Sequence, residues 1–129
     1  MPRSALTLST CAAVLLLLTI LAPVCRSGTS QSDLDKLRSE IVSMIGDARA
    51  TDIRFCRTIA FGSKPCGGPW EYLVFSTQRT DSTAIASRVD RYNALESQLN
   101  NDEGRISDCA LPAVPELHLT DGSCTGVAP

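Results

Sequence analysis

Histidine is almost absent from this sequence, because His118 is the single one among 129 residues. A serine hydrolase needs a serine, a histidine and an acid held together, and a catalytic cysteine is usually activated by a histidine. His118 alone would have to serve either site, and no G-x-S-x-G turn of the α/β-hydrolase type occurs. We therefore predict that the chain has no serine or cysteine catalytic site.

Patterns that bind metals or cofactors are also missing. The cysteines after residue 27 include no C-x-x-C pair, which most structural zinc sites use. The acidic stretch 100–108 does not match an EF-hand, because counting from Asn100 the glycine comes one position early and position 12 is Leu111. We predict no metal site and no cofactor.

Neither an excess of basic residues nor a long apolar run is present. The chain has 12 Lys and Arg against 14 Asp and Glu, without a basic cluster. A mildly acidic chain of this kind is a poor ligand for nucleic acid or for an anionic membrane surface. The most apolar run, residues 12–22, is shorter than the roughly 20 residues of a membrane-spanning helix. We expect neither a nucleic-acid partner nor a membrane span.

That apolar run has the place and length of a secretory signal. Arg3 supplies a basic start, residues 12–22 form an apolar core, and small residues follow. The residues before Cys25 do not fit a lipoprotein site, since Pro and Val stand where small residues are needed. We predict a signal peptide over 1–27, a secreted protein, and a single small domain over 28–129.

Apolar residues recur at helical spacing in two segments. The first helix, 33–50, is expected to begin after Ser32, which starts a capping-box pattern. The second, 82–100, can be capped by Asp81 or Ser82, and Gly104 is a stop signal. The apolar stripes of the two segments consist of Leu34, Leu37, Ile41, Met44, Ile45 and Ala48, and of Ile85, Val89, Tyr92, Leu95 and Leu99.

Three segments have the composition of strands. Residues 53–61 and 70–77 alternate β-branched or aromatic residues with others, and 62–69 between them is rich in glycine and proline. A short strand at 116–120 precedes an Asp-Gly turn. We expect 53–61 and 70–77 to form a hairpin, and 116–120 to lie antiparallel beside 53–61. The predicted fold is α+β, with two helices packed on a short antiparallel sheet and two disulfides.

Four cysteines remain after the signal, and a secreted chain would join them in disulfides. Cys56 lies at the base of the expected hairpin and Cys66 at its tip, roughly 15 Å apart or more, which disfavours a bond between them. Helix 82–100 returns the chain to the tip, so we predict the pairs Cys66–Cys109 and Cys56–Cys124. The alternative, Cys56–Cys109 with Cys66–Cys124, remains open.

The loop 62–69 is the best candidate for a binding surface. A proline-containing loop closed by a disulfide loses little entropy on binding, and exposed Trp, Tyr and Lys are natural contact residues. We therefore name Lys64, Trp70 and Tyr72 as candidate binding residues. The alternative is that Trp70 and Phe61 fill the core, while the glycines only form the turn.

The same region carries a resemblance to a protein family. The stretch CRTIAFGSKPCGGPWEYLVFS, the helix end LESQLNNDEG and the following SDC resemble a family of small secreted or lipid-anchored proteins with the pattern A-F-G-x-K-P-C-G-G-P-x-x-Y-L-V-[YF]-S and then S-D-C. The resemblance covers roughly 56–109. It implies a common fold and shared disulfide positions at Cys56, Cys66 and Cys109, and it brings no activity with it.

These observations favour a secreted, non-enzymatic binding module with an extracellular protein partner, for example an inhibitor of an extracellular enzyme. The alternatives are a small secreted hydrolase or metal-dependent enzyme with an unidentified site, and a structural matrix component. An enzyme should have a polar cleft around His118 or Asp102. A binding module should expose Lys64, Trp70 and Tyr72 together on one patch.

Overall fold

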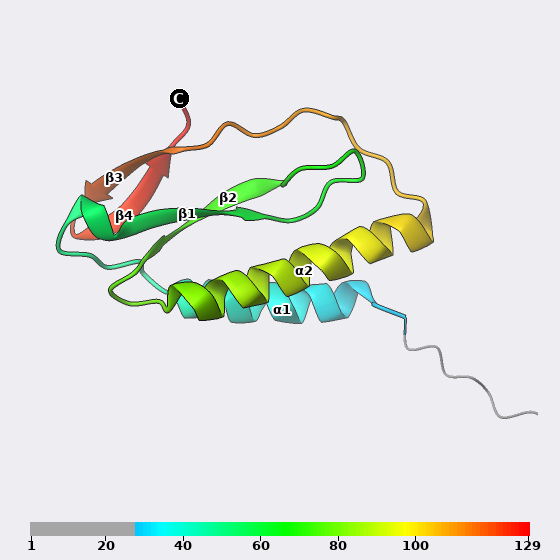
Figure 1. Ribbon diagram of the computed structural model, residues 1–129, viewed down its shortest axis with the longest axis horizontal. Helices are drawn as coiled ribbons and strands as arrows, with labels where there is room; N and C mark the ends of the chain where they lie inside the picture. Colours follow the sequence, from blue (N-terminus) through cyan, green and yellow to red (C-terminus); the bar gives the residue numbers. More distant parts are fainter. Residues whose placement is uncertain (1–27) are drawn as a thin grey trace, which may run out of the picture.

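The computed structural model describes residues 28–129, so the predicted signal peptide over 1–27 lies outside the described residues. Two helices and two small antiparallel sheets form an α+β domain (Figure 1). Within residues 28–129, neither helix has the length and apolar character that crossing a membrane requires. The elements are α1 (Gln31–Ile45), β1 (Cys56–Phe61), β2 (Glu71–Ser76), α2 (Ser82–Glu103), β3 (Glu116–Thr120) and β4 (Ser123–Val127).

Helix α1 begins and ends earlier than the sequence predicts. Its cap is Ser30 rather than Ser32, and Ser30 forms the capping box with Asp33. The helix stops at Gly46, which has a φ of 57°, a conformation that favours glycine. The expected extension to residue 50 is wrong, because segment 48–50 bonds instead to the C-terminal hairpin through Ala50 N–H to Gly122 O (3.0 Å) and Cys124 N–H to Ala48 O (3.0 Å).

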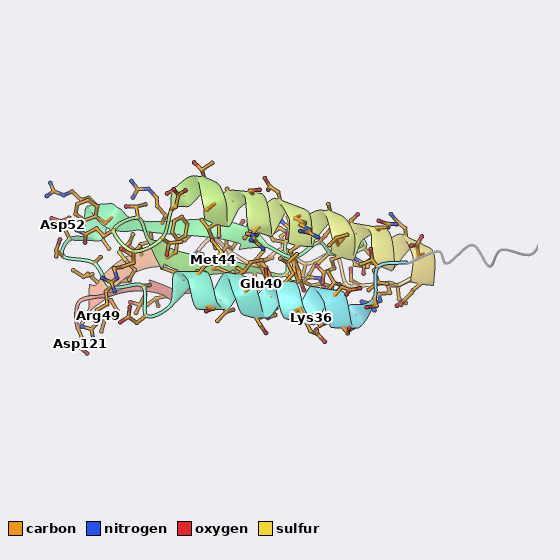
Figure 2. All side chains as sticks on the ribbon, turned by 90° about the horizontal axis from the view of Figure 1, so that it is seen from below. Lys36, Glu40, Met44, Arg49, Asp52 and Asp121 are labelled. Atoms are coloured by element: carbon orange, nitrogen blue, oxygen red, sulfur yellow. A yellow bond between two sulfur atoms is a disulfide. The ribbon has the colours of Figure 1, made fainter. Side chains whose placement is uncertain are left out.

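Helix α2 begins after Asp81, one of the two residues expected to cap it, and runs to Glu103, three residues beyond the expected end at residue 100. The Asp81 carboxylate accepts hydrogen bonds from the backbone N–H groups of residues 83 and 84, and Gly104 ends the helix in the left-handed conformation. Figure 2 shows α1 and α2 side by side on one side of the sheets. An ion pair between Arg88 and Glu40 (2.6 Å) joins their outer surfaces.

Strands β1 and β2 form the predicted hairpin, in register from Cys56 opposite Ser76 to Phe61 opposite Glu71. One face of the hairpin packs on the helices, and there Phe61 stacks on Tyr92 with 4.3 Å between ring centroids. The residues ahead of Cys56 form a single 3-10 turn, Ile53–Phe55, instead of the expected start of the strand. The main core consists of Leu34, Leu37, Ile41, Phe61, Phe75, Ile85, Val89, Tyr92 and Leu99.

The C-terminal strands correct the expected sheet. Strand β3 has the predicted bounds, but it pairs with β4 in a second two-stranded sheet instead of joining β1. The connecting turn places Asp121 and Gly122 at φ values of 52° and 74°, which is the geometry of a two-residue type I′ hairpin. That tight turn pairs β3 with its immediate neighbour in the chain. The second sheet then packs across the first, where Gly126 lies against Val74.

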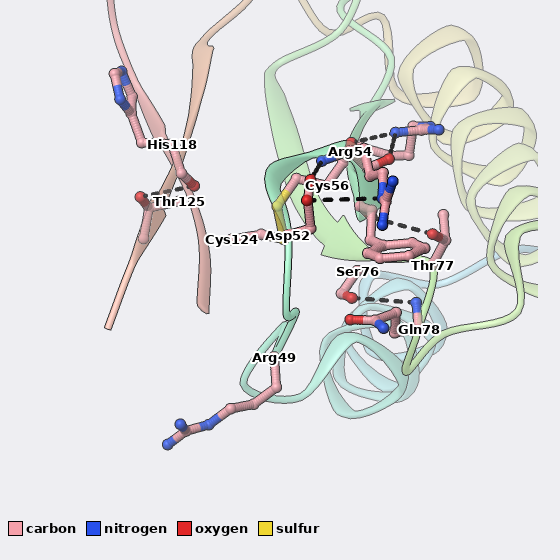
Figure 3. The surroundings of a disulfide bond; sticks show 12 residues. Arg49, Asp52, Arg54, Cys56, Ser76, Thr77, Gln78, His118, Cys124 and Thr125 are labelled. Atoms are coloured by element: carbon pink, nitrogen blue, oxygen red, sulfur yellow. Dashed lines mark hydrogen bonds and ion pairs between the residues drawn. A yellow bond between two sulfur atoms is a disulfide. The ribbon is translucent and has the colours of Figure 1, made fainter. Parts of the chain in front are cut away.

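Both disulfides connect the predicted cysteines. Cys56–Cys124 joins β1 to β4, and Cys66–Cys109 joins the hairpin tip to the segment after α2, with Cα–Cα distances of 5.5 and 5.4 Å. The alternative pairing is therefore wrong. Figure 3 shows the Cys56–Cys124 disulfide bridging the two sheets.

Candidate functional site

The tip of the β1–β2 hairpin is the part of the molecule that gathers the predicted binding residues. We call residues 62–69 the tip loop and residues 105–115 the connecting segment. In Figure 1 the tip loop lies next to the C-terminal end of α2, and the connecting segment passes over it on its way to β3. The site is therefore built by three parts of the chain that are distant in sequence.

Trp70 lies directly against the backbone of the tip loop. Its backbone N–H donates to the Phe61 carbonyl (2.9 Å), which fastens Trp70 to the end of β1. Gly62, opposite, has a φ of 85°, and a Cβ there would come within 2.5 Å of the Trp70 ring. Glycine at position 62 is therefore required by the close approach of the indole ring as well as by the backbone conformation.

Three polar side chains of α2 hold the tip loop. Asn93 accepts a hydrogen bond from Gly62 N–H (2.8 Å), Glu96 accepts one from Ser63 N–H (2.5 Å), and the Asn100 amide donates to the Ser63 carbonyl (2.7 Å). The sequence reasoning missed these residues. Their positions, three and then four residues apart on one helix face, are the signal that could have identified them.

Lys64 corrects the expectation of an exposed binding lysine. Only 8% of its surface is exposed, and its ammonium donates to the Asp108 carboxylate (2.6 Å) and to the Ala110 carbonyl (2.5 Å). It also lies 4.9 Å from the centroid of the Trp70 ring, within the range of a cation–π interaction. A buried ammonium needs such partners. Lys64 therefore fastens the connecting segment to the tip loop and is not available to a protein partner.

The Lys64–Asp108 pair should make the tip sensitive to acid. The hydrogen bond from Lys64 lowers the pKa of the Asp108 carboxyl below its ordinary value. A carboxyl with a lower pKa in the folded chain stabilises the fold above its unfolded pKa of about 4, and this contribution is lost as the pH falls through the folded pKa. We expect Trp70 fluorescence to change as Asp108 is protonated below about pH 4, and Asp108→Asn to abolish that step.

The measurement is an acid titration of tryptophan fluorescence, which reports on Trp70 alone because the sequence has one tryptophan. Asp90→Asn is the matched control, since Asp90 is an exposed aspartate on α2 that takes part in none of the ion pairs within residues 28–129. It should keep the acid step. A step of equal size and midpoint in Asp108→Asn would contradict the role of the pair.

The remaining candidate binding residues are accessible. Trp70 is 44% exposed, so Phe61 fills the core and Trp70 does not. Tyr72 is half-buried on β2, and because its neighbour Leu73 packs against the helix core, Tyr72 points to the opposite face of the strand. Leu111 of the connecting segment lies against Gly68 and is 66% exposed. We call Trp70, Tyr72 and Leu111 the tip patch.

The regions named for an enzyme site lie elsewhere. His118 is exposed on β3, and Figure 3 shows its side chain pointing away from the Cys56–Cys124 disulfide. A surface hollow of about 330 Å³ lies between α1 and α2. Another of about 460 Å³ is lined by residues 49–51, by Gln78 and Arg79, and by Gly122. Neither hollow is lined by His118 or Asp102. Among residues 28–129 no group of three His, Cys, Asp or Glu side chains is placed to hold a metal ion.

The contacts at the tip explain most of the motif that carries the family resemblance. In K-P-C-G-G-P, Lys64 forms an ion pair with Asp108 of S-D-C, and Cys66 forms a disulfide with Cys109 of S-D-C. The second glycine, Gly68, leaves room for Leu111. The motif is therefore a set of structural contacts. The resemblance itself stays a prediction. Comparison of the chain with family models, with curated proteins and with solved structures gives no match.

Proposed function

We propose that this chain is a non-enzymatic binding module and that the tip patch is its contact surface for an extracellular protein. The observation that carries the proposal is that Trp70 is nearly half exposed although its surroundings hold it firmly. Gly62 supports one part of the ring and the Lys64 ammonium faces it. Tryptophan and tyrosine are among the residues that contribute most to protein–protein binding energy.

The support beneath the patch reduces the entropy cost of binding. The tip loop is fixed by α2 through Asn93, Glu96 and Asn100, and the connecting segment is fixed to it by a disulfide and by Lys64. A surface that is already ordered before it meets a partner keeps more of its contact energy as affinity. Because Lys64 is occupied, recognition would depend on apolar contact rather than on a lysine side chain.

The test compares capture of extracellular proteins by the immobilised folded domain and by Trp70→Ala and Leu111→Ala variants. Ile53→Ala is the matched control, because Ile53 is an exposed apolar residue at the opposite end of the hairpin. We expect one partner to be recovered by the wild type and by Ile53→Ala, and to be reduced at least tenfold with Trp70→Ala, which corresponds to about 1.4 kcal/mol of binding energy.

A direct readout separates a contact from an indirect effect. Incorporation of 5-fluorotryptophan gives a single fluorine resonance, because Trp70 is the sole tryptophan. This resonance should shift when the purified partner is added. Equal recovery of the partner by all variants, or a resonance that does not move on binding, would remove the tip patch from the proposal.

A further inference from the structure

The two disulfides differ sharply in their surroundings. Cys56 and Cys124 are 1% and 6% exposed and belong to a second buried cluster with Ala48 and Ala50. Cys66 and Cys109 are both exposed. Thiol–disulfide exchange needs the attacking thiolate to reach a sulfur atom. A thiol in solution can therefore approach one disulfide, while the folded structure shields the other.

The exposed disulfide also fastens a segment with little other support. Residues 106–115 take part in none of the backbone–backbone hydrogen bonds found among the loops and turns of residues 28–129. Between the end of α2 and the start of β3, the connecting segment is tied to the tip loop by Cys66–Cys109, by the Lys64 ammonium and by the contact of Leu111 with Gly68. The tip loop has its own hydrogen bonds to α2 and does not depend on this disulfide.

We propose that Cys66–Cys109 is a thiol-exchange site, open to small thiols and to the dithiols of extracellular oxidoreductases. The thiolate attacks one sulfur and forms a mixed disulfide, and the other cysteine leaves as a thiolate and takes up a proton. A second thiol then attacks the mixed disulfide, which releases the second protein thiol and the oxidised form of the reagent. Two electrons pass from the thiols to the protein disulfide, and Cys56–Cys124 stays intact.

Opening this disulfide changes the tip patch. Leu111 belongs to the connecting segment and Trp70 to the hairpin, so the patch combines two parts of the chain that the disulfide holds together. After reduction, the connecting segment keeps only the hydrogen bonds of Lys64 and the contact of Leu111 with Gly68 at the tip loop. When the segment moves away, Lys64 loses Asp108 and Ala110, and the environment of the Trp70 ring changes with it. The inference rests on the burial and connectivity of the cysteines, and not on whether the patch binds a partner.

The experiment uses purified oxidised protein whose pre-existing thiols have been blocked with N-ethylmaleimide. The protein is incubated with reduced glutathione or with dithiothreitol under native conditions, quenched with iodoacetamide and mapped by mass spectrometry. We expect alkylation at Cys66 and Cys109 at least tenfold faster than at Cys56 and Cys124, accompanied by a change in Trp70 fluorescence. Equal rates for the two pairs, or faster labelling of Cys56 and Cys124, would overturn the proposal.

A variant with Cys66→Ser and Cys109→Ser imitates the reduced state without a reagent. It should keep the far-ultraviolet circular dichroism of the wild type and show the Trp70 fluorescence of the reduced protein. Glutathione should then have no further effect on its fluorescence. If selective reduction leaves Trp70 fluorescence unchanged in the wild type, the coupling of the disulfide to the tip patch is wrong.

Discussion

Replacing both Cys56 and Cys124 with alanine is expected to lower the free energy of unfolding by about 4 kcal/mol or more. The disulfide closes a loop with a sequence separation of 68, and loss of such a constraint on the unfolded chain accounts for about 4 kcal/mol in the chain-entropy model. Both sulfurs are also buried between the sheets, so their removal leaves unfilled space. Urea unfolding without reducing agent measures the change.

The pair Cys66→Ala with Cys109→Ala is the control for this experiment. Its loop has a sequence separation of 43, and because the entropic contribution depends on the logarithm of loop length, it nearly equals that of the longer loop. The exposed sulfurs leave no cavity. We therefore expect the buried pair to cost more than the exposed pair, and the reverse order would contradict the packing role of Cys56 and Cys124.

Phe61→Ala is expected to destabilise the fold by about 3–5 kcal/mol, the range for removing a buried aromatic ring. Phe61 is almost completely buried, stacks on Tyr92, and has the Arg38 guanidinium 5.1 Å from its ring centroid. It also ends β1 directly before the tip loop, so its loss should loosen the backbone that supports Trp70. Urea unfolding and Trp70 fluorescence measure the two effects.

Phe55→Ala provides the matched comparison, because Phe55 is half-buried at the other end of the same hairpin. It should cost clearly less than Phe61→Ala and should leave the fluorescence of native Trp70 unchanged. If the two variants lose the same stability, Phe61 is not the aromatic centre of the core. If Phe61→Ala leaves Trp70 unaffected, the tip loop is supported by α2 alone.

Both helices and the strands β1, β2 and β3 could be predicted because each depends on neighbours in the sequence, whereas β4 (Ser123–Val127) was not predicted. The apolar stripe of α2 identifies the helix, its caps Asp81 and Gly104 mark the ends, and the bounds of β3 follow from its alternation and the Asp-Gly turn. The disulfide pairing could also be predicted, since the lengths of the hairpin and α2 determine which cysteines can meet. In α1 the actual cap, Ser30, was missed because two capping patterns overlap within a few residues.

The candidate site was predicted less completely. The tip loop and Trp70 were identified, but the burial of Lys64 was not. Its main partner, Asp108, is 44 positions away in the sequence, and no local pattern in the tip loop distinguishes a lysine that points inward from one that points to solvent. Asn93, Glu96 and Asn100 were missed for a related reason, because their partners are backbone groups of a distant loop.

The sequence by itself determined the α+β class, the two helices, the hairpin and the cysteine pairs, because periodicity, capping residues and element lengths act locally or through simple geometry. Only the tertiary structure decided that the C-terminal strands form a second sheet, and that Lys64 is buried while Trp70 and Leu111 are exposed. Those outcomes depend on the path of the connecting segment over the hairpin tip, and contacts between residues far apart in the chain determine that path.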